Sequence, residues 1–170
     1  AWTRAFIGSM HRRGRLAGEA LARALNDHGD LEGGKRLLDL GGGSGAFSHA
    51  LLSLRPDLRA TLFDLPEVVA LAREYAEDAG LAERMEFIAG DLREDSFGRA
   101  YDLILVSAIC HMLSPADNRR LLGRLAACLA PGGRLVISDF ILDEDRCRPA
   151  WASLFGINML VATGGGDSYS

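Results

Sequence analysis

Four polar side chains that can hold or move a proton stand in or just after short apolar runs of this sequence. Asp64, Asp91 and His111 each follow such a run, and Asp139 lies inside the last one. An imidazole titrates at about pH 6.5 and can take a proton from a hydroxyl at neutral pH, and a neighbouring carboxylate can fix its tautomer. We therefore expect His111 to act as a general base, with Asp139 orienting its ring.

Four glycines fall within positions 41–45, in the stretch LLDLGGGSGAF that begins at Leu37. A backbone without side chains can turn sharply and approach a ligand, and the helix that follows offers its N-terminus to a negative group. Asp64 follows the glycines by about twenty residues, the spacing at which a carboxylate accepts hydrogen bonds from both hydroxyls of a ribose. The pattern predicts a nucleoside-type ligand. Because Gly41, Gly43 and Ala46 also satisfy the dinucleotide pattern G-x-G-x-x-G/A, the glycines alone leave the kind of nucleoside open.

Short apolar runs alternate with helical patterns along the chain, which predicts a parallel sheet with helices on both faces. In such a sheet ligands lie beyond the carboxyl ends of the strands, where the polar residues fall. The predicted strands are Arg36 to Leu40, Leu58 to Phe63, Met85 to Ala89, Tyr101 to Ser107 and Arg134 to Leu142. The predicted helices are Leu16 to Leu25, Gly45 to Pro56, Pro66 to Gly80, Ser114 to Gly133 and Pro149 to Val161.

Composition excludes several classes of partner. The chain has 170 residues, 48% hydrophobic, with a net charge of −4 and no block of like charges, so we expect one domain over residues 1–170 and neither a nucleic-acid nor a membrane partner. The cysteines are odd in number and lack C-x-x-C spacing, which favours a reducing compartment, and we expect a cytoplasmic protein without a metal site. Cys110 is expected to be buried rather than nucleophilic, and solvated positions are expected for His11, His28 and His49.

Five segments in order, LLDLGGGSGAF, TLFDLPEVV, FIAGDL, YDLILVSAICHML and CLAPGGRLVISDFIL, resemble the S-adenosylmethionine-dependent methyltransferases. More narrowly, they resemble the O-methyltransferases that include caffeate, acetylserotonin and bacterial natural-product enzymes. The resemblance implies a Rossmann-like methyltransferase fold and S-adenosylmethionine as cofactor, without a metal. The implied acceptor is a hydroxyl of a small aromatic or polyketide-like molecule, and the sequence does not name it.

The resemblance also implies roles for individual residues. Asp64 would bind the ribose, Asp91 the adenine amino group, and Leu92 would pack on the ring. The cofactor-binding set is Asp39, Gly41, Gly43, Gly45, Asp64, Leu65, Asp91, Leu92 and Ser107. The substrate-binding set is Phe6, Met10, Met112, Asn158 and Met159, and the catalytic pair is His111 and Asp139. The family carries a second acid beside the histidine, and whether Asp167 or Ser168 takes that place is left open.

The chain departs from the family pattern in places that bear on function. His111 is followed by Met112-Leu113 rather than Asp-Trp, which favours the bacterial branch. The family's N-terminal dimerisation domain and last antiparallel strands are not recognisable, so we expect a partial catalytic domain and a homodimer for the full-length protein. We also expect the fifth strand to be an exposed edge that favours association.

Two alternatives stay open. A relative could use the same cofactor for C- or N-methylation or for chemistry in which no methyl moves, because a histidine does not name the atom that attacks. The chain could also be an NAD(P)-binding oxidoreductase domain, because its glycines fit that pattern as well.

Overall fold

A five-stranded, all-parallel sheet forms the centre of the computed structural model, which describes residues 2–33 and 36–170. The strand order is β3-β2-β1-β4-β5, so the order reverses direction between β1 and β4. The strands are β1 (Arg36–Leu40), β2 (Arg59–Asp64), β3 (Met85–Ala89), β4 (Tyr101–Ser107) and β5 (Leu129–Ser138). The first four agree with the predicted strands to within one residue.

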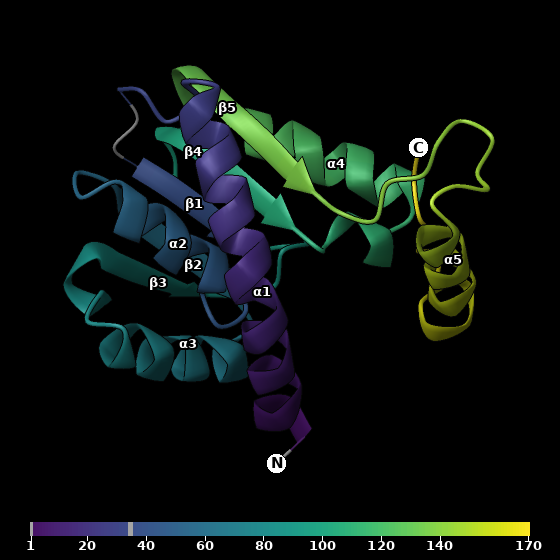
Figure 1. Ribbon diagram of the computed structural model, residues 1–170, viewed down its shortest axis with the longest axis horizontal. Helices are drawn as coiled ribbons and strands as arrows, with labels where there is room; N and C mark the ends of the chain where they lie inside the picture. The colour runs from purple at the N-terminus through teal and green to yellow at the C-terminus, as the bar shows by residue number, and fades with distance from the viewer. Residues whose placement is uncertain (1, 34–35) are drawn as a thin grey trace.

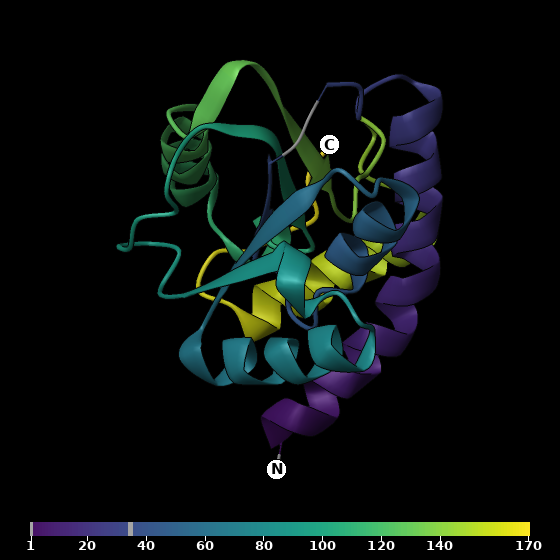
Figure 2. The same cartoon turned by 90° about the vertical axis from the view of Figure 1, so that its left-hand side faces the viewer.

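Helices cover both faces of the sheet. They are α1 (Trp2–Asp27), α2 (Ala46–Leu54), α3 (Pro66–Asp78), α4 (Pro115–Ala126) and α5 (Ala150–Ala162), with short 3-10 turns η1 (Ala82–Arg84) and η2 (Cys110–Met112). Residues of α1, α2 and α3 share one buried apolar cluster, and α4 packs into a second cluster on the other face. Figure 2 shows α1 in purple and α4 in green on opposite sides of the strands. The predicted α/β fold class is confirmed.

Helix α1 begins much earlier than the sequence pattern indicated, at Trp2 rather than Leu16. Glycines interrupt its apolar stripe and hide the helical period. Two of them have a packing role, since an added Cβ at Gly14 would lie 3.1 Å from the Ala46 side chain and one at Gly18 would lie 3.1 Å from the Ala46 carbonyl oxygen. The glycines therefore let α1 lie directly against the first turn of α2.

Strand β5 is also shifted, beginning at Leu129 and ending at Ser138 instead of running from Arg134 to Leu142. The prediction treated Pro131-Gly132-Gly133 as a turn before the strand. The structure instead places them within β5, where the pairing with β4 shifts register after Tyr101↔Leu129 and resumes at Leu103↔Arg134. Proline is tolerated at such irregular positions of an edge strand because its missing N–H is not needed by the ladder. Asp139 consequently lies just after β5 rather than inside it.

Helix α5 lies off the sheet, beyond the carboxyl ends of β4 and β5 (Figure 1). Several of its large apolar side chains are exposed, namely Trp151, Leu154, Ile157, Leu160 and Val161. No helix within residues 2–33 and 36–170 is both long enough and apolar enough to cross a membrane.

Candidate active site

The glycine segment 41–45 follows β1 at the point where the strand order reverses, which is where open α/β sheets bind ligands. The Gly41 amide donates to the Phe63 carbonyl at 2.7 Å, which ties the start of the loop to β2. Gly41 has φ 65° and an added Cβ would lie 2.3 Å from the Ile109 Cδ1, so both its conformation and its surroundings require glycine. Gly43 and Gly45 also have positive φ, at 58° and 79°. The loop thus turns through three left-handed glycines just ahead of α2.

Asp64 ends β2 beside this loop and is held by two backbone amides. Its Oδ2 accepts from the Gly43 amide at 2.8 Å, and its Oδ1 accepts from the Leu65 amide at 2.8 Å. Burial raises the pKa of the carboxyl, although both hydrogen bonds act in the opposite direction. Each carboxylate oxygen keeps a further lone pair, so the group can still accept from a vicinal diol. The geometry therefore suits the predicted ribose contact.

Asp39 lies beneath the loop rather than on its open side. It is 1% exposed, and its Oδ2 accepts a hydrogen bond from the Ser48 hydroxyl at 2.6 Å. The other oxygen, Oδ1, is buried without a hydrogen-bond partner. Burial raises the pKa of Asp39 to about 6, and the charge of Asp64 adds to this effect. Asp39 thus supports the loop from below, and a direct contact with a cofactor stays a prediction.

Replacing Asp39 by asparagine is expected to stabilise the protein above about pH 7 and to make its unfolding free energy less dependent on pH. The folded-state pKa of about 6 exceeds the unfolded value of about 3.9, so this group stabilises the fold fully below the unfolded value. That contribution is lost as pH rises through about 6. The unfolding free energies of the two proteins should diverge by on the order of 2–3 kcal/mol across that window.

Urea unfolding of both proteins, at a pH below the unfolded pKa of Asp39 and at a pH above its folded pKa, measures this difference in unfolding free energy. Asp27→Asn, at the exposed end of α1, is the matched control. An Asp39→Asn protein that is destabilised equally at both ends of the window would contradict this account.

The remaining predicted cofactor residues lie along the same edge of the sheet. Asp91 follows β3, and its Oδ1 accepts from the Arg93 amide at 2.8 Å. Leu92 is partly buried, and Ser107 is the last residue of β4. Leu65 is 45% exposed next to Asp64. The structure thus brings the predicted cofactor residues to one edge, although no contact reveals which of them a ligand would touch.

His111 and Asp139 form a close pair at the neighbouring part of this edge. The His111 Nδ1 lies 2.7 Å from the Asp139 Oδ1, and the His111 backbone amide donates to Oδ2 at 3.2 Å. Burial acts to raise the pKa of Asp139, but hydrogen bonds from His111 and from the Phe140 amide outweigh it and hold the pKa below its usual value. An ionised Asp139 accepts the Nδ1 proton, which leaves Nε2 as the free acceptor of the ring.

Aromatic rings enclose the histidine, a feature that the sequence did not predict. His111 is 8% exposed and meets Phe140 and Phe155 edge-on, with ring centroids 5.4 and 4.9 Å away. Phe140 stacks on Phe155 at 3.8 Å, and Trp151 meets Phe140 edge-on at 5.4 Å. Phe155 and Trp151 come from α5, so the placement of that helix completes the surroundings of His111.

The short turn η2 that carries His111 is held by hydrogen bonds from α4 and from the segment after α5. Asn118 of α4 donates from Nδ2 to the carbonyl oxygens of Cys110 at 2.9 Å and Leu113 at 3.3 Å. Tyr169 donates its hydroxyl to the Leu113 carbonyl, and the Asp167 amide donates to the His111 carbonyl at 3.0 Å. These bonds hold the backbone of the turn in place.

Neither Asp167 nor Ser168, the two candidates for a second group beside the histidine, is hydrogen-bonded to the His111 ring. The Asp167 carboxylate pairs with Arg146 at 2.5 Å, and the buried Ser168 hydroxyl donates to the Ala152 carbonyl at 2.8 Å. Both residues therefore have other partners, and the observed carboxylate partner of the histidine is Asp139.

The predicted substrate residues are divided between three segments. Phe6 and Met10 lie on α1, where Phe6 is 46% exposed and stacks on Trp2. Met112, next to His111, is 42% exposed. On α5, Asn158 is exposed whereas Met159 is 7% exposed. Met112 is adjacent to the catalytic pair, and the roles of the others stay predictions.

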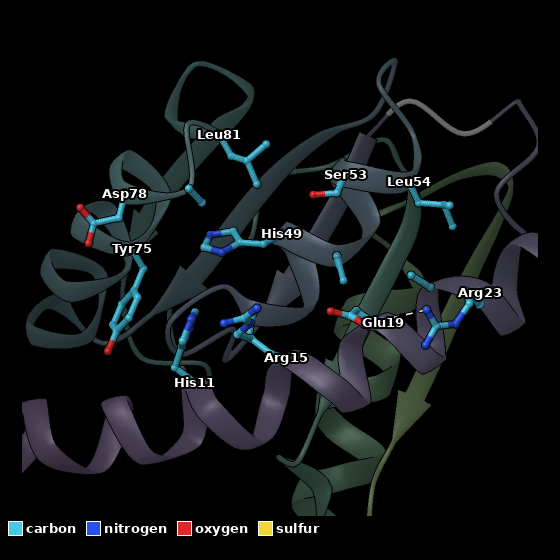
Figure 3. A pocket seen from close by; sticks show the side chains of 14 residues that line it. His11, Arg15, Glu19, Arg23, His49, Ser53, Leu54, Tyr75, Asp78 and Leu81 are labelled. Carbon is cyan, nitrogen blue, oxygen red and sulfur yellow. Dashed lines mark ion pairs between the residues drawn. The ribbon is translucent and has the colours of Figure 1, made fainter.

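A cavity of about 680 Å³ lies between α1, α2 and α3 (Figure 3), and neither His111 nor Asp139 lines it. His11 and His49 line it, and both are partly buried rather than solvated as expected. The His49 Nε2 is buried without a hydrogen-bond partner, and burial lowers the pKa of its ring to about 4. Cys110 is buried as expected, and its thiol pKa is raised by burial to about 11. Across the described part of the chain no three His, Cys, Asp or Glu side chains are grouped to hold a metal ion.

A glycine loop and a histidine–carboxylate pair thus lie at the carboxyl edge of an all-parallel sheet, where open α/β sheets bind ligands. Residues 2–169 match the O-methyltransferase domain family, and the chain belongs to that family. It is 38% identical over 144 residues to 3-hydroxy-5-methyl-1-naphthoate 3-O-methyltransferase of Streptomyces sahachiroi, covering 85% of this chain and 42% of that protein. It is 32% identical over 167 residues to the tetracenomycin polyketide synthesis 8-O-methyl transferase TcmO of Streptomyces glaucescens, covering 98% and 48% of the two chains.

The fold agrees closely with a solved relative. The crystal structure of human N-acetylserotonin methyltransferase in complex with SAM superposes with a TM-score of 0.85 at 30% identity, covering 97% of this chain and 45% of that one. These comparisons confirm the resemblance seen in the sequence and the methyltransferase fold. The chain spans about half the length of the curated relatives it matches, so the activity of the whole protein is a proposal.

Proposed function

We propose that the protein transfers a methyl group from S-adenosylmethionine to a hydroxyl of a small aromatic, polyketide-like molecule. The observation that carries the proposal is the His111–Asp139 pair, 2.7 Å apart, at the same sheet edge as the glycine loop and Asp64. The naphthoate and tetracenomycin names of two relatives support an aromatic polyketide acceptor.

The glycine loop and Asp64 fit this cofactor. Among the described residues beyond its chain neighbours, an added Cβ at Gly43 would have only Ile7 within 4 Å, at 4.0 Å, so the backbone can approach a ligand there, and the Asp64 carboxylate can accept from both ribose hydroxyls. Asp91 and Leu92 lie beyond the neighbouring strand, where an adenine would follow its ribose. When bound, S-adenosylmethionine supplies a sulfonium-activated methyl carbon, so that an O–C bond forms as the C–S bond breaks and S-adenosylhomocysteine leaves.

His111 takes the proton that the acceptor hydroxyl loses. A phenol has a pKa of about 10 and is mostly protonated at neutral pH, so a base that removes the proton as the O–C bond forms lowers the barrier. Asp139 binds Nδ1 and orients the ring, which leaves Nε2 to accept that proton. Phe140 and Phe155 flank the ring with apolar surface that suits a planar acceptor and excludes water.

We also propose that the protein works in the cytoplasm. Its cysteines, Cys110, Cys128 and Cys147, are free, which suits the reducing cytoplasm. We take residues 1–170 as a partial catalytic domain and the full-length protein as a homodimer that binds neither nucleic acid nor membrane.

Incubation with methyl-labelled S-adenosylmethionine and a panel of hydroxynaphthoates, polycyclic phenols and N-acetylserotonin tests the proposal. The expected result is an O-methylated product from at least one phenol and none from the matched analogue with hydrogen in place of the hydroxyl. Mass spectrometry locates the methyl group. Labelled carbon found on a ring carbon or a nitrogen, or equal labelling of the deoxy analogue, would replace this proposal by the C- or N-methylation alternative.

A further inference from the structure

The glycine loop is held from two sides, and one of the holding groups belongs to neither predicted set of site residues. On the sheet side, Asp64 accepts from the Gly43 amide at 2.8 Å. On the opposite side, the hydroxyl of Ser44 lies 2.9 Å from the Nδ1 of His11, a residue of α1. Ser44 is 4% exposed, so this hydrogen bond satisfies a polar group that is buried in the middle of the loop.

His11 is itself fixed in place. Its ring stacks on Tyr75 of α3 at a centroid distance of 4.2 Å and an interplanar angle of 21°. About two turns earlier on α1, Arg4 makes a two-pronged ion pair with Glu74, with distances of 2.6 and 2.8 Å. Figure 3 shows His11 and Tyr75 projecting toward each other from their two helices. The imidazole therefore meets the loop from a defined position.

The chemistry of the His11 and Ser44 side chains favours a hydrogen bond between them. Burial, and then the charge of Arg15, lowers the pKa of His11, so the ring is neutral at physiological pH. A neutral imidazole nitrogen either donates or accepts, and a serine hydroxyl does both. The bond consequently forms with either tautomer of the ring.

We propose that His11 is a positioning residue for the cofactor loop. Its hydrogen bond to Ser44 holds residues 41–45 in the conformation that binds the nucleoside, and so couples the docking of α1 to cofactor affinity. The proposal rests on the proposed function, because it takes this loop as the site of S-adenosylmethionine. A histidine that only packs α1 against α3 would contribute to stability and leave the loop unaffected.

A double-mutant cycle with S-adenosylhomocysteine as the probe distinguishes these roles. His11→Phe keeps a ring on Tyr75 and removes Nδ1, Ser44→Ala removes the hydroxyl, and the third variant combines both. Each single variant is expected to weaken binding by about 3- to 10-fold, the equivalent of one hydrogen bond, and the double variant by no more than either one. His11→Asn, whose amide can occupy the place of Nδ1, should recover part of the loss, and Ser53→Ala on the cavity wall should bind as the unmodified protein does.

Amide hydrogen exchange in the absence of any ligand gives a second readout. Exchange of peptides covering residues 41–52 should be faster in His11→Phe than in the unmodified protein, because the loop has lost its hydrogen bond to α1. Affinity within twofold of the unmodified protein in both single variants, or fully additive losses, would overturn the proposal even if thermal stability fell. If the unmodified protein failed to bind S-adenosylhomocysteine, the proposed function would fall, and exchange alone would decide whether His11 holds the loop.

Discussion

His111→Ala should lower the turnover of methyl transfer by roughly 10²–10⁴-fold while the affinity for S-adenosylhomocysteine stays within about twofold. The reason is the arrangement of the ring, whose Nδ1 is taken by Asp139 at 2.7 Å, so that Nε2 is the nitrogen left to receive the acceptor's proton. Steady-state kinetics with the acceptor found in the phenol panel give the turnover. Calorimetry with S-adenosylhomocysteine gives the affinity.

Two matched variants separate proton removal from packing. His28→Ala removes an exposed histidine and should leave turnover unchanged. Asp139→Asn keeps the size of the carboxylate and should cost less than His111→Ala, because the base remains and only its orientation is weakened. Turnover of the His111→Ala protein near that of the unmodified enzyme would show that positioning the acceptor suffices and that the base assignment is wrong.

The parts of this fold that the sequence predicted are those set by local patterns. The runs that became β1 to β4 are short and apolar and are bounded by helix start and stop residues, such as Pro66 at the first position of α3. Because carboxyl ends of parallel strands share one edge, placing the strands also placed the glycine loop, Asp64, Asp91 and His111 together.

The parts that were missed depend on contacts between distant segments. Phe155 reaches His111 only because the irregular connection after β5 returns α5 to the strand ends, and nothing in the residues themselves specifies that path. His11 and His49 were expected in solvent because they stand in helix-like or loop surroundings in the sequence. They are partly buried because Gly14 and Gly18 bring α1 close against α2.

Asp64→Ala should weaken S-adenosylhomocysteine binding by roughly 10²–10⁴-fold, since two charge-assisted hydrogen bonds of about 1.5–3 kcal/mol each are lost. The Gly43 amide, 2.8 Å from the carboxylate, also loses its acceptor, so one of the hydrogen bonds that tie the loop to β2 is lost. Asp64→Asn keeps one acceptor oxygen, so its affinity for S-adenosylhomocysteine should lie between those of Asp64→Ala and the unmodified protein.

Glu77→Ala is the matched control, because it removes an exposed carboxylate from the same region of the chain, near the far end of α3. Its affinity should equal that of the unmodified protein. Unchanged affinity in Asp64→Ala would mean that the ribose is held elsewhere.

The most direct test of the central claim, that the glycine loop and Asp64 form an S-adenosylmethionine site, is a calorimetric titration of the unmodified protein with S-adenosylhomocysteine in the presence and absence of NAD. We predict saturable binding of one molecule per chain that excess NAD leaves unchanged. The claim would be contradicted if NAD bound more tightly than S-adenosylhomocysteine or displaced it. Such a result would indicate a dinucleotide-binding domain instead.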